Sequence, residues 1–280
     1  MSREPNTEHF VAQHYAQSNL ERTILDAFAA SGKDIERLSP SDLSIVDEFH
    51  TGGRQATLEL ATEAGFASAM YILDVGCGIG GPSRTIAEAY GCCVTGIDLT
   101  EDYVRTAGAL AKRVGLAECV TYRQASALAL PFEPGTFDGA YMMHVGMNIS
   151  DKAGLFAEVH RVLKSGSRFA IFDAMRVGDS ELTFPVHWAA TREISFVDSP
   201  EEYHHALRAA GFEIIHERNR REFAREVFRE AQAKIAASDG APPLGLHILM
   251  KANVVEKLTN VMNAVEQGLI APIELICRTR

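Results

Sequence analysis

Short apolar runs alternate with segments of helical periodicity along most of the chain. Apolar residues recur every three or four positions over 7–38, which predicts helical structure interrupted at Ser31 and Gly32. Further on, the predicted strands are residues 71–75, 93–97, 120–123, 139–143, 169–173, 212–216 and 273–277. Apolar runs separated by helices are typical of strands buried on both faces of a parallel sheet. The pattern therefore predicts an α/β fold with a doubly wound sheet.

The remaining segments predict helices and one long insertion. Helices are expected over 58–64, from Pro82, from Glu101, and over 152–163, 199–210, 220–237 and 253–268, with a turn at 240–243. The segment between the last two predicted strands is far longer than a hairpin connection needs, so it is an insertion. Long additions to such a sheet usually shape the substrate site.

A glycine-rich loop follows the first predicted strand. Gly76, Gly78 and Gly80 let the chain turn tightly and let a ligand touch bare backbone, and the helix beginning near Pro82 directs its amides at that ligand. Dinucleotide sites use the spacing G-x-G-x-x-G and keep negative charge away from the pyrophosphate. Here the spacing is G-x-G-x-G, and Asp74 precedes the first glycine. A carboxylate there suits an ammonium and a sulfonium, which favours S-adenosylmethionine over NAD.

A second carboxylate supports a nucleoside ligand. Asp98 ends the second predicted strand, roughly 20 residues beyond the glycines, where a carboxylate can accept both ribose hydroxyls. Both cofactor classes use such a residue, so Asp98 indicates a nucleoside without choosing between them.

Four segments together carry a family resemblance: residues 73–84 (LDVGCGIGGPSR), 96–98 (GID), 130–132 (LPF) and 137–138 (FD). Over about residues 47–212 the chain resembles class I S-adenosylmethionine-dependent methyltransferases, in the small-molecule branch that includes sarcosine/dimethylglycine, phosphoethanolamine and tocopherol methyltransferases. The resemblance implies a Rossmann-like seven-stranded sheet, mostly parallel with the last strand antiparallel, plus N-terminal helices and a helical cap. The expected organisation is an N-terminal helical lid segment at residues 1–65 and a methyltransferase core at residues 66–280. Within the core, cap insertions are expected at about 174–198 and about 217–270.

The resemblance also implies which residues hold the cofactor. The methionine end falls to the glycine loop and its neighbours, the ribose and adenine to the end of the second strand, and the adenine edge to the loop before Leu130. These residues are Asp74, Gly76, Cys77, Gly78, Gly80, Asp98, Leu99, Ser126, Ala127 and Met143. Many relatives carry Asp at the place of Ser126. A hydroxyl there can still accept from the adenine amino group, but it gives up a charge-assisted bond.

Residues 47–54 (DEFHTGGR) precede the first predicted strand, and similar His-x-Gly-Gly-like segments of the family lie over the cofactor as a lid. Gly53 would let the lid backbone approach closely, and the guanidinium of Arg54 suits a carboxylate. The alternative is a turn between helices with a solvated arginine. His50 of the same segment is a candidate substrate contact.

The acceptor side needs few chemically special residues, because in-line methyl transfer mainly requires alignment, with a base where the nucleophile arrives protonated. His144 follows the fourth predicted strand, whose carboxyl end lies at the crevice of such sheets, so it is the candidate base or orienting group, with Asn148 beside it. A structural histidine is the alternative. His187, Trp188 and Phe196 are candidates for an acceptor wall, against the alternative of plain packing.

Charge and composition exclude several partners. With 27 Lys+Arg against 37 Asp+Glu, the net charge is −10, which argues against nucleic acid or an anionic membrane as partner. No run of about 18 apolar residues exists, and the first ten residues lack the layout of a signal or transit peptide, so a cytoplasmic location is expected. Five cysteines without a C-x-x-C pair indicate reduced thiols and no metal site. The helix at 253–268 leaves a homodimer open.

The sequence therefore predicts in-line methyl transfer from S-adenosylmethionine to a nitrogen or oxygen of a small-molecule acceptor. Nitrogen is slightly favoured on the resemblance alone. Two alternatives stay open: an NAD(P)-dependent oxidoreductase, and a non-catalytic protein that binds S-adenosylmethionine.

Overall fold

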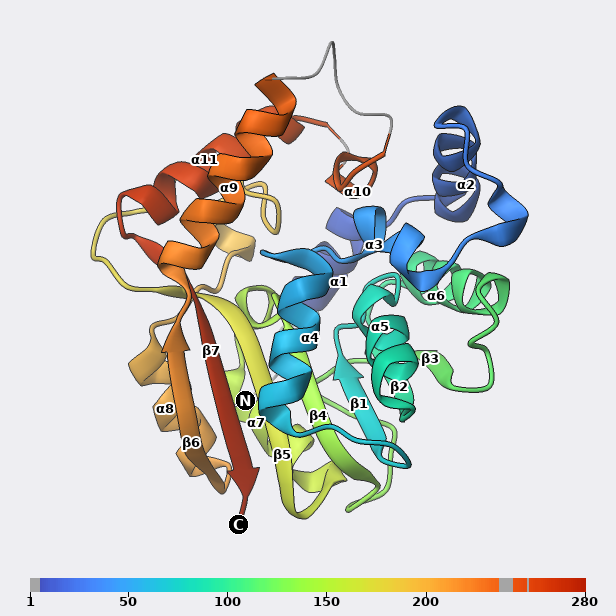
Figure 1. The fold of residues 1–280 in the computed structure, drawn as a ribbon. Helices are drawn as coiled ribbons and strands as arrows, with labels where there is room; N and C mark the ends of the chain where they lie inside the picture. Colours follow the sequence, from blue (N-terminus) through green and yellow to red (C-terminus); the bar gives the residue numbers. More distant parts are fainter. Residues whose placement is uncertain (1–5, 237–243, 251) are drawn as a thin grey trace.

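A computed structural model of the chain describes residues 6–236, 244–250 and 252–280, so the turn predicted at 240–243 lies outside the described residues. A seven-stranded sheet in the order β3-β2-β1-β4-β5-β7-β6 forms its centre (Figure 1). The strands are β1 (Tyr71–Val75), β2 (Cys93–Asp98), β3 (Val120–Gln124), β4 (Phe137–Met143), β5 (Leu163–Arg176), β6 (Phe212–Asn219) and β7 (Ile270–Thr279). Strand β7 runs antiparallel to both of its neighbours, and the other pairs are parallel. The predicted doubly wound sheet with an antiparallel last strand is confirmed.

Helices pack on both faces of this sheet and above it. The α-helices are α1 (Asn6–Tyr15), α2 (Leu20–Ala30), α3 (Pro40–Asp47), α4 (Gly53–Ala64), α5 (Gly81–Tyr90), α6 (Glu101–Arg113), α7 (Lys152–Val162), α8 (Pro200–Ala209), α9 (Arg221–Ala236), α10 (His247–Met250) and α11 (Val254–Glu266). Three short 3-10 helices are η1 (Ile35–Arg37), η2 (Gly146–Asn148) and η3 (Arg192–Ile194). Serine capping boxes begin α3 and α8 and satisfy backbone amides that a helix start leaves without partners.

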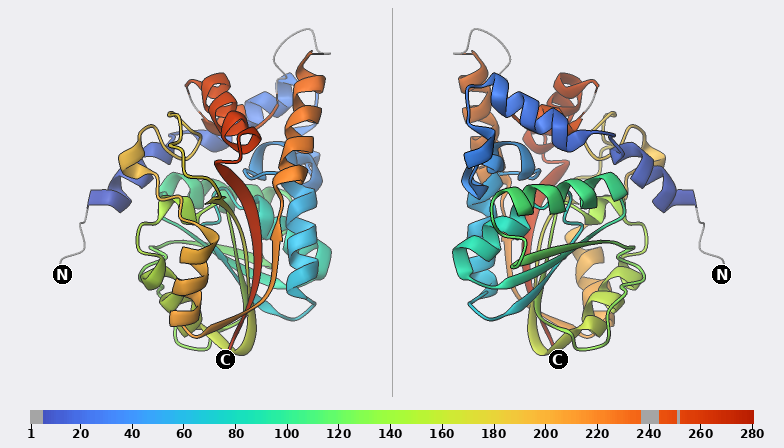
Figure 2. Two further views of the ribbon diagram at one scale, coloured as in Figure 1. Left: turned by 90° about the vertical axis from the view of Figure 1, so that its left-hand side faces the viewer. Right: turned by 90° about the vertical axis from the view of Figure 1, so that its right-hand side faces the viewer.

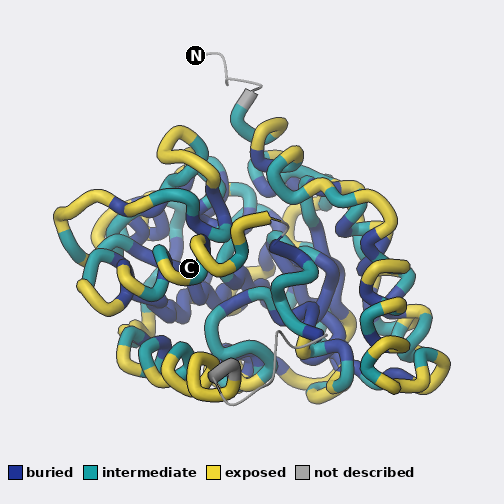
Figure 3. The backbone as a smooth tube through the Cα atoms, turned by 90° about the horizontal axis from the view of Figure 1, so that it is seen from above, coloured by how far each residue is buried: buried dark blue, intermediate teal, exposed yellow. Residues whose placement is uncertain are grey.

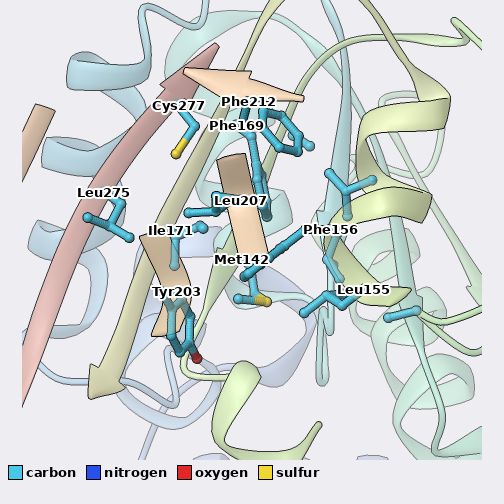
Figure 4. Packing of buried hydrophobic residues seen from close by; sticks show 14 of the residues in the cluster. Met142, Leu155, Phe156, Phe169, Ile171, Tyr203, Leu207, Phe212, Leu275 and Cys277 are labelled. Carbon is cyan, nitrogen blue, oxygen red and sulfur yellow. The ribbon is translucent and has the colours of Figure 1, made fainter. Parts of the chain in front are cut away.

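Successive residues of the central strands face opposite sides, as strand geometry requires. Ile72 and Tyr141 face the layer of α4 and α5, whereas Leu73 and Met142 face α7 and α8. Figure 4 shows the second of these cores, in which Met142 and the other labelled side chains fill the space between the sheet and α7 and α8. Because both faces are covered, the strands read as continuous apolar runs in the sequence.

A cap lies over the carboxyl ends of the parallel strands. It contains α1 to α3 from the start of the chain and α9 to α11 from the insertion between β6 and β7 (Figure 1). The two side views show α1 on the flank of the cap, where it contacts η3 (Figure 2). Seen from above, buried segments lie at the centre and exposed turns at the periphery (Figure 3).

Several boundaries differ from the prediction, three of them for an identifiable physical reason. The N-terminal helical stretch has a further break between α1 and α2, where Asn19 takes a left-handed conformation with φ 59°. Helix α4 begins at Gly53 rather than at residue 58, because its first turn is polar and hides the helical periodicity. Strand β5 runs from Leu163 to Arg176 and is longer than the predicted strand at 169–173. The prediction missed its start because residues 164–168 are polar and carry no apolar signal. The division of the chain at residue 65 stays a prediction.

Candidate active site

A cavity of about 710 Å³ opens where the carboxyl ends of the parallel strands meet the cap. Its volume lies in the ~300–1,000 Å³ range of small-molecule sites. The predicted site residues that line it are His50, Gly76, Cys77, Gly78, Asp98, Leu99, Ser126, Ala127, Met143, His144, Asn148 and Phe196. The structure therefore brings most of the predicted residues to one place.

The loop after β1 is built around the end of β2. The amides of Gly76 and Cys77 both donate to the carbonyl of Ile97, at 2.9 Å each. Gly76 has φ 76°, and a Cβ there would collide with the side chain of Val145, so only glycine keeps this part of the cavity open. The loop leads directly into α5, which begins at Gly81. Such a bare backbone cradle at a helix start fits the methionine end of S-adenosylmethionine.

Asp98 is held at the cavity wall with oxygen positions to spare. Its Oδ1 accepts from the amide of Thr100 at 2.8 Å, and its Oδ2 accepts from the amide of Gly78 at 3.0 Å. A carboxylate offers about four acceptor sites, so roughly two remain for a ribose diol. Burial raises the pKa of Asp98, and the two amides oppose that rise by favouring the ionised form.

Asp74, which is expected to help hold the methionine end, does not line the cavity. Asp74 is 2% exposed, and its Oδ2 accepts from Ser83 Oγ at 2.5 Å and from Tyr141 Oη at 2.6 Å. It lies behind the glycine loop because its strand position faces α5. Gly80 is likewise absent from the cavity wall, and its carbonyl accepts from Tyr122 Oη at 3.3 Å.

Asp74 predicts a measurable pH dependence. Burial raises its pKa to about 7 from an ordinary 3.8. Between about pH 4 and 7 the folded protein holds a proton that the unfolded chain has released, so this carboxyl makes stability fall as the pH rises through that window. Asp74→Asn removes the dependence. We expect urea unfolding to give the variant a more favourable free energy of unfolding, relative to that of the parent, at pH 8 than at pH 5. An equal difference in unfolding free energy at both pH values would contradict the raised pKa.

Asp47 is a cavity residue that the sequence did not single out. Its Oδ2 accepts from Arg84 Nη2 at 2.5 Å, and both side chains are 1% exposed. Its Oδ1 has no hydrogen-bond partner among the described residues, and burial raises the pKa of Asp47 to about 6. The pairing was not predictable, because Asp47 and Arg84 belong to separate helices, α3 and α5.

Helix α1, part of the predicted N-terminal lid segment, lines the opposite end of the cavity with residues that the sequence did not single out. Ser126 Oγ donates to Oε1 of Glu8 and accepts from the amide of Leu128 at 3.0 Å. Tyr15 of the same helix packs against Tyr103, with ring centroids 5.9 Å apart, and donates to Oδ1 of Asn148 at 3.3 Å. No local sequence signal links residues so far apart in the chain.

His144 occupies the acceptor end. It has φ 54°, and its ring lies among three others: Phe172, His50 and His187, with centroids at 5.2, 6.2 and 6.5 Å. Neither ring nitrogen has a hydrogen-bond partner among the described residues. Burial, together with the neighbouring histidines, lowers the pKa of His144 well below its usual value, so the imidazole is neutral at pH 7.

A buried carboxylate that sequence patterns do not single out anchors the loop after β4. Oδ2 of Asp173, at the end of β5, accepts from the amide of Gly146 and from Tyr203 Oη, both at 2.7 Å. A Cβ on Gly146 would collide with both side chains. Asp173 and Tyr203 are positioning residues for His144 and Asn148, because they fix the turn between them.

His50 has several partners at the same end. Its Nε2 lies 3.1 Å from the Gly53 carbonyl and 3.1 Å from Thr57 Oγ1. Burial lowers the pKa of His50 to about 4, so it is also neutral. The carboxylate of Glu48 lies behind it, where Thr57 and Thr85 donate to its two oxygens at 2.8 and 2.6 Å.

Besides Asp74 and Gly80, four predicted site residues do not line the cavity. Arg54 points away from it, because α4 places its guanidinium 2.8 Å from Glu88 on α5. Gly53 begins α4, its amide donates to the carbonyl of His50, and its carbonyl lies 3.1 Å from Nε2 of His50. Trp188 is 1% exposed in the core of the cap, where its indole donates to Ser195 Oγ at 2.9 Å, so the packing alternative holds for it. His187 lies behind His144, with ring planes 17° apart.

Comparisons with known proteins agree with this geometry. Residues 73–171, from β1 through most of β5, match the family described as "Methyltransferase domain". This segment of the chain is therefore similar to the methyltransferase domain of S-adenosylmethionine-dependent enzymes. The match supports S-adenosylmethionine rather than a dinucleotide as the cofactor.

Three proteins with a similar sequence or structure provide more detailed comparisons. The sterol 24-C-methyltransferase of Eremothecium gossypii is 32% identical over 58% of the chain, and the chain spans only 45% of that relative. O-methyltransferase resE of Aspergillus sclerotiorum is 29% identical over 86% of the chain and 89% of the relative. Phosphoethanolamine N-methyltransferase 2 of Haemonchus contortus has the same fold, with a TM-score of 0.74 and 17% identity over 98% of the chain and 60% of that structure.

Over residues 6–236, 244–250 and 252–280, no helix has both the length and the apolar character needed to cross a bilayer.

Proposed function

We propose that the protein transfers a methyl group from S-adenosylmethionine to a hydroxyl oxygen of an uncharged, mainly apolar small molecule. The observation that carries this proposal is the composition of the cavity wall. No lysine or arginine is among the described residues that line it. A phosphate or carboxylate on the acceptor would therefore be buried without an opposite charge, which costs several kcal/mol.

The cavity wall combines apolar side chains with uncharged polar groups and with carboxylates, among them Asp151 and Glu193. Its apolar lining comes from β4, α10 and the loops around them and includes Phe49, Met143, Val145, Ile149, Phe196 and Leu249. The neutral imidazoles of His50 and His144 and the amide of Asn148 supply hydrogen bonds there. A few polar groups in an apolar wall orient an acceptor that is itself apolar with one polar group.

The cavity residues divide the work of the reaction. When bound, S-adenosylmethionine supplies an electrophilic methyl group on a sulfonium. Asp98 accepts from the ribose, the loop at Gly76 makes room for the methionine end, and the unpartnered Oδ1 of Asp47 is available to its ammonium. A nitrogen of His144 accepts the hydroxyl hydrogen bond and takes the proton as the carbon–oxygen bond forms and the carbon–sulfur pair returns to sulfur.

This proposal revises the slight preference for nitrogen. An alkyl amine enters as an ammonium, which has no lone pair, and its usual pKa near 10 lies far above that of either cavity imidazole. A hydroxyl keeps a lone pair without losing its proton first. The similarity to resE over nearly the full length of both chains supports oxygen as well. The cytoplasmic location and a homodimer stay predictions.

Carbon is the second candidate nucleophile. Several relatives are named sterol 24-C-methyltransferases, and an apolar cavity suits such an acceptor equally well. Addition of a methyl group to a double bond leaves a cation, which the rings of Phe49 and Phe196 at the cavity wall would stabilise.

The test uses isotope-labelled S-adenosylmethionine and acceptors in matched pairs: aromatic or terpenoid alcohols, their phosphate esters, and the corresponding amines. We expect label in the alcohols only, with NMR placing the methyl group on oxygen. Label on carbon would favour the second candidate. Preference for phosphate esters or amines would contradict the uncharged acceptor, and no labelled product at all would favour the non-catalytic alternative.

His144→Ala tests the proposed base. We expect kcat to fall by about 10²–10⁴, as for removal of a general base, with little change in the affinity for S-adenosylhomocysteine. The exposed His216 provides the control, since His216→Ala makes the same change far from the cavity. Unchanged turnover in His144→Ala at saturating acceptor would refute this role and leave His144 a structural histidine.

A further inference from the structure

Helix α1 carries a carboxylate into the far end of the cofactor cleft. Glu8 lines the cavity, and its Oε1 accepts from Ser126 Oγ in the loop after β3. The two residues are 118 positions apart in sequence. This contact therefore joins the first helix of the chain to the methyltransferase core.

The position of Asp98 indicates which part of the cofactor lies at Glu8. The methionine end occupies the glycine loop and the ribose lies at Asp98, so the base extends beyond Asp98, away from the loop. The cavity wall in that direction is formed by Leu99, Ala127 and Leu128, whose apolar side chains suit the faces of a flat ring. Ser126 and Glu8 lie at the edge of this slot.

Adenine presents an amino group at its edge, and this donor needs an acceptor when it is buried. The Ser126 hydroxyl already donates to Glu8 and accepts from the amide of Leu128. A carboxylate has about four acceptor sites, of which Ser126 occupies one. Glu8 therefore has the larger spare capacity and the negative charge that strengthens such a bond.

We propose that Glu8 accepts a hydrogen bond from the adenine amino group, and that α1 is thereby part of the cofactor site. The proposal rests on S-adenosylmethionine being the cofactor, as the proposed function requires. Ser126 holds the Glu8 carboxylate in place and is the positioning residue.

The other end of α1 supports this arrangement. Tyr15 packs on Tyr103, which also lines the cavity, and donates to Asn148 at the acceptor end. The helix thus spans the cleft from the base to the acceptor. Cofactor binding through Glu8 would order the same helix that places Tyr15 against the acceptor loop.

The test is a cycle of calorimetric titrations that combines a protein change with a ligand change. The ligands are S-adenosylhomocysteine and its analogue with purine in place of adenine, which lacks only the amino group. The proteins are the parent, Glu8→Ala, and the control Glu118→Ala, which removes an exposed glutamate far from the cavity. Since only binding is measured, no acceptor is needed.

We expect the parent and Glu118→Ala to bind the purine analogue about 10- to 100-fold more weakly than S-adenosylhomocysteine, as for loss of one hydrogen bond to a charged group. In Glu8→Ala the affinities for the two ligands should agree within roughly threefold, because the amino group that distinguishes the ligands no longer has its acceptor. Ser126→Ala should keep part of the difference, since Glu8 remains.

Three results would overturn the proposal. If the parent does not distinguish the ligands, or if Glu8→Ala weakens both equally, Glu8 does not contact the amino group. If the difference disappears in Ser126→Ala but persists in Glu8→Ala, the hydroxyl is the acceptor instead. Failure of the parent to bind S-adenosylhomocysteine at all is a separate outcome that overturns the cofactor assignment together with this proposal.

Discussion

Replacing Asp98 with alanine is expected to weaken S-adenosylhomocysteine binding by at least about 100-fold. The carboxylate is placed to accept two ribose hydroxyls, and a hydrogen bond to a charged group contributes about 1.5–3 kcal/mol. The substitution also frees the amides of Gly78 and Thr100, which Asp98 holds in the loops on either side of it. Isothermal titration of parent and variant measures the loss.

Asp102 supplies the matched control for this experiment. It lies on the first turn of α6, pairs with Arg105 at 2.5 Å and does not line the cavity. Asp102→Ala should leave the affinity within about twofold, whereas Asp98→Asn, which keeps an acceptor but loses the charge, should fall between the parent and Asp98→Ala. An Asp98→Ala protein that binds as well as the parent would remove the ribose from this position.

Removing the guanidinium of Arg84 is expected to cost about 3–5 kcal/mol of unfolding free energy. Arg84 and Asp47 are each 1% exposed and are joined at 2.5 Å, and Arg84 Nη1 also donates to the carbonyl of Ala107 at 3.3 Å. Breaking a buried ion pair from one side leaves an uncompensated charge, which is why the loss is large. Urea unfolding of Arg84→Met measures it.

A second substitution, at Asp47, and the pH dependence of unfolding both test whether an unpaired charge causes the loss of stability in Arg84→Met. The double variant Arg84→Met/Asp47→Asn has no lone buried charge, so it should recover much of the loss. The deficit of the single variant should also shrink near pH 5, because burial already raises the pKa of Asp47 to about 6 and the carboxyl then becomes neutral. A deficit unaffected by either change would mean that packing, rather than charge, explains the loss.

The sequence predicts the sheet well because both of its faces are buried. Ile72 and Leu73 serve opposite cores, so β1 is apolar at adjacent positions and is easily recognised. Where the chain is polar, the prediction is wrong about boundaries. The first turn of α4 and residues 164–168 of β5 owe their structure to tertiary pairing, which local periodicity does not contain.

Local sequence likewise predicts some of the site residues and misses those that depend on tertiary contacts. Gly76 and Asp98 follow their strands immediately, and parallel strands bring their carboxyl ends together, so local sequence was sufficient to place them. Trp188 shows the limit of such reasoning, because composition does not say whether an aromatic side chain faces a cavity or a core. Glu8 contacts Ser126, and Asp173 contacts Gly146. The partners are far apart in sequence, and only the fold brings them together.

The most direct test of the account is a titration of the unmodified protein with S-adenosylhomocysteine and, separately, with NADH. The geometry of the loop at Gly76 and of Asp98 predicts micromolar binding of S-adenosylhomocysteine and no measurable binding of NADH. Binding of NADH without binding of S-adenosylhomocysteine would contradict the cofactor assignment, and with it the methyl transfer proposed for this cavity.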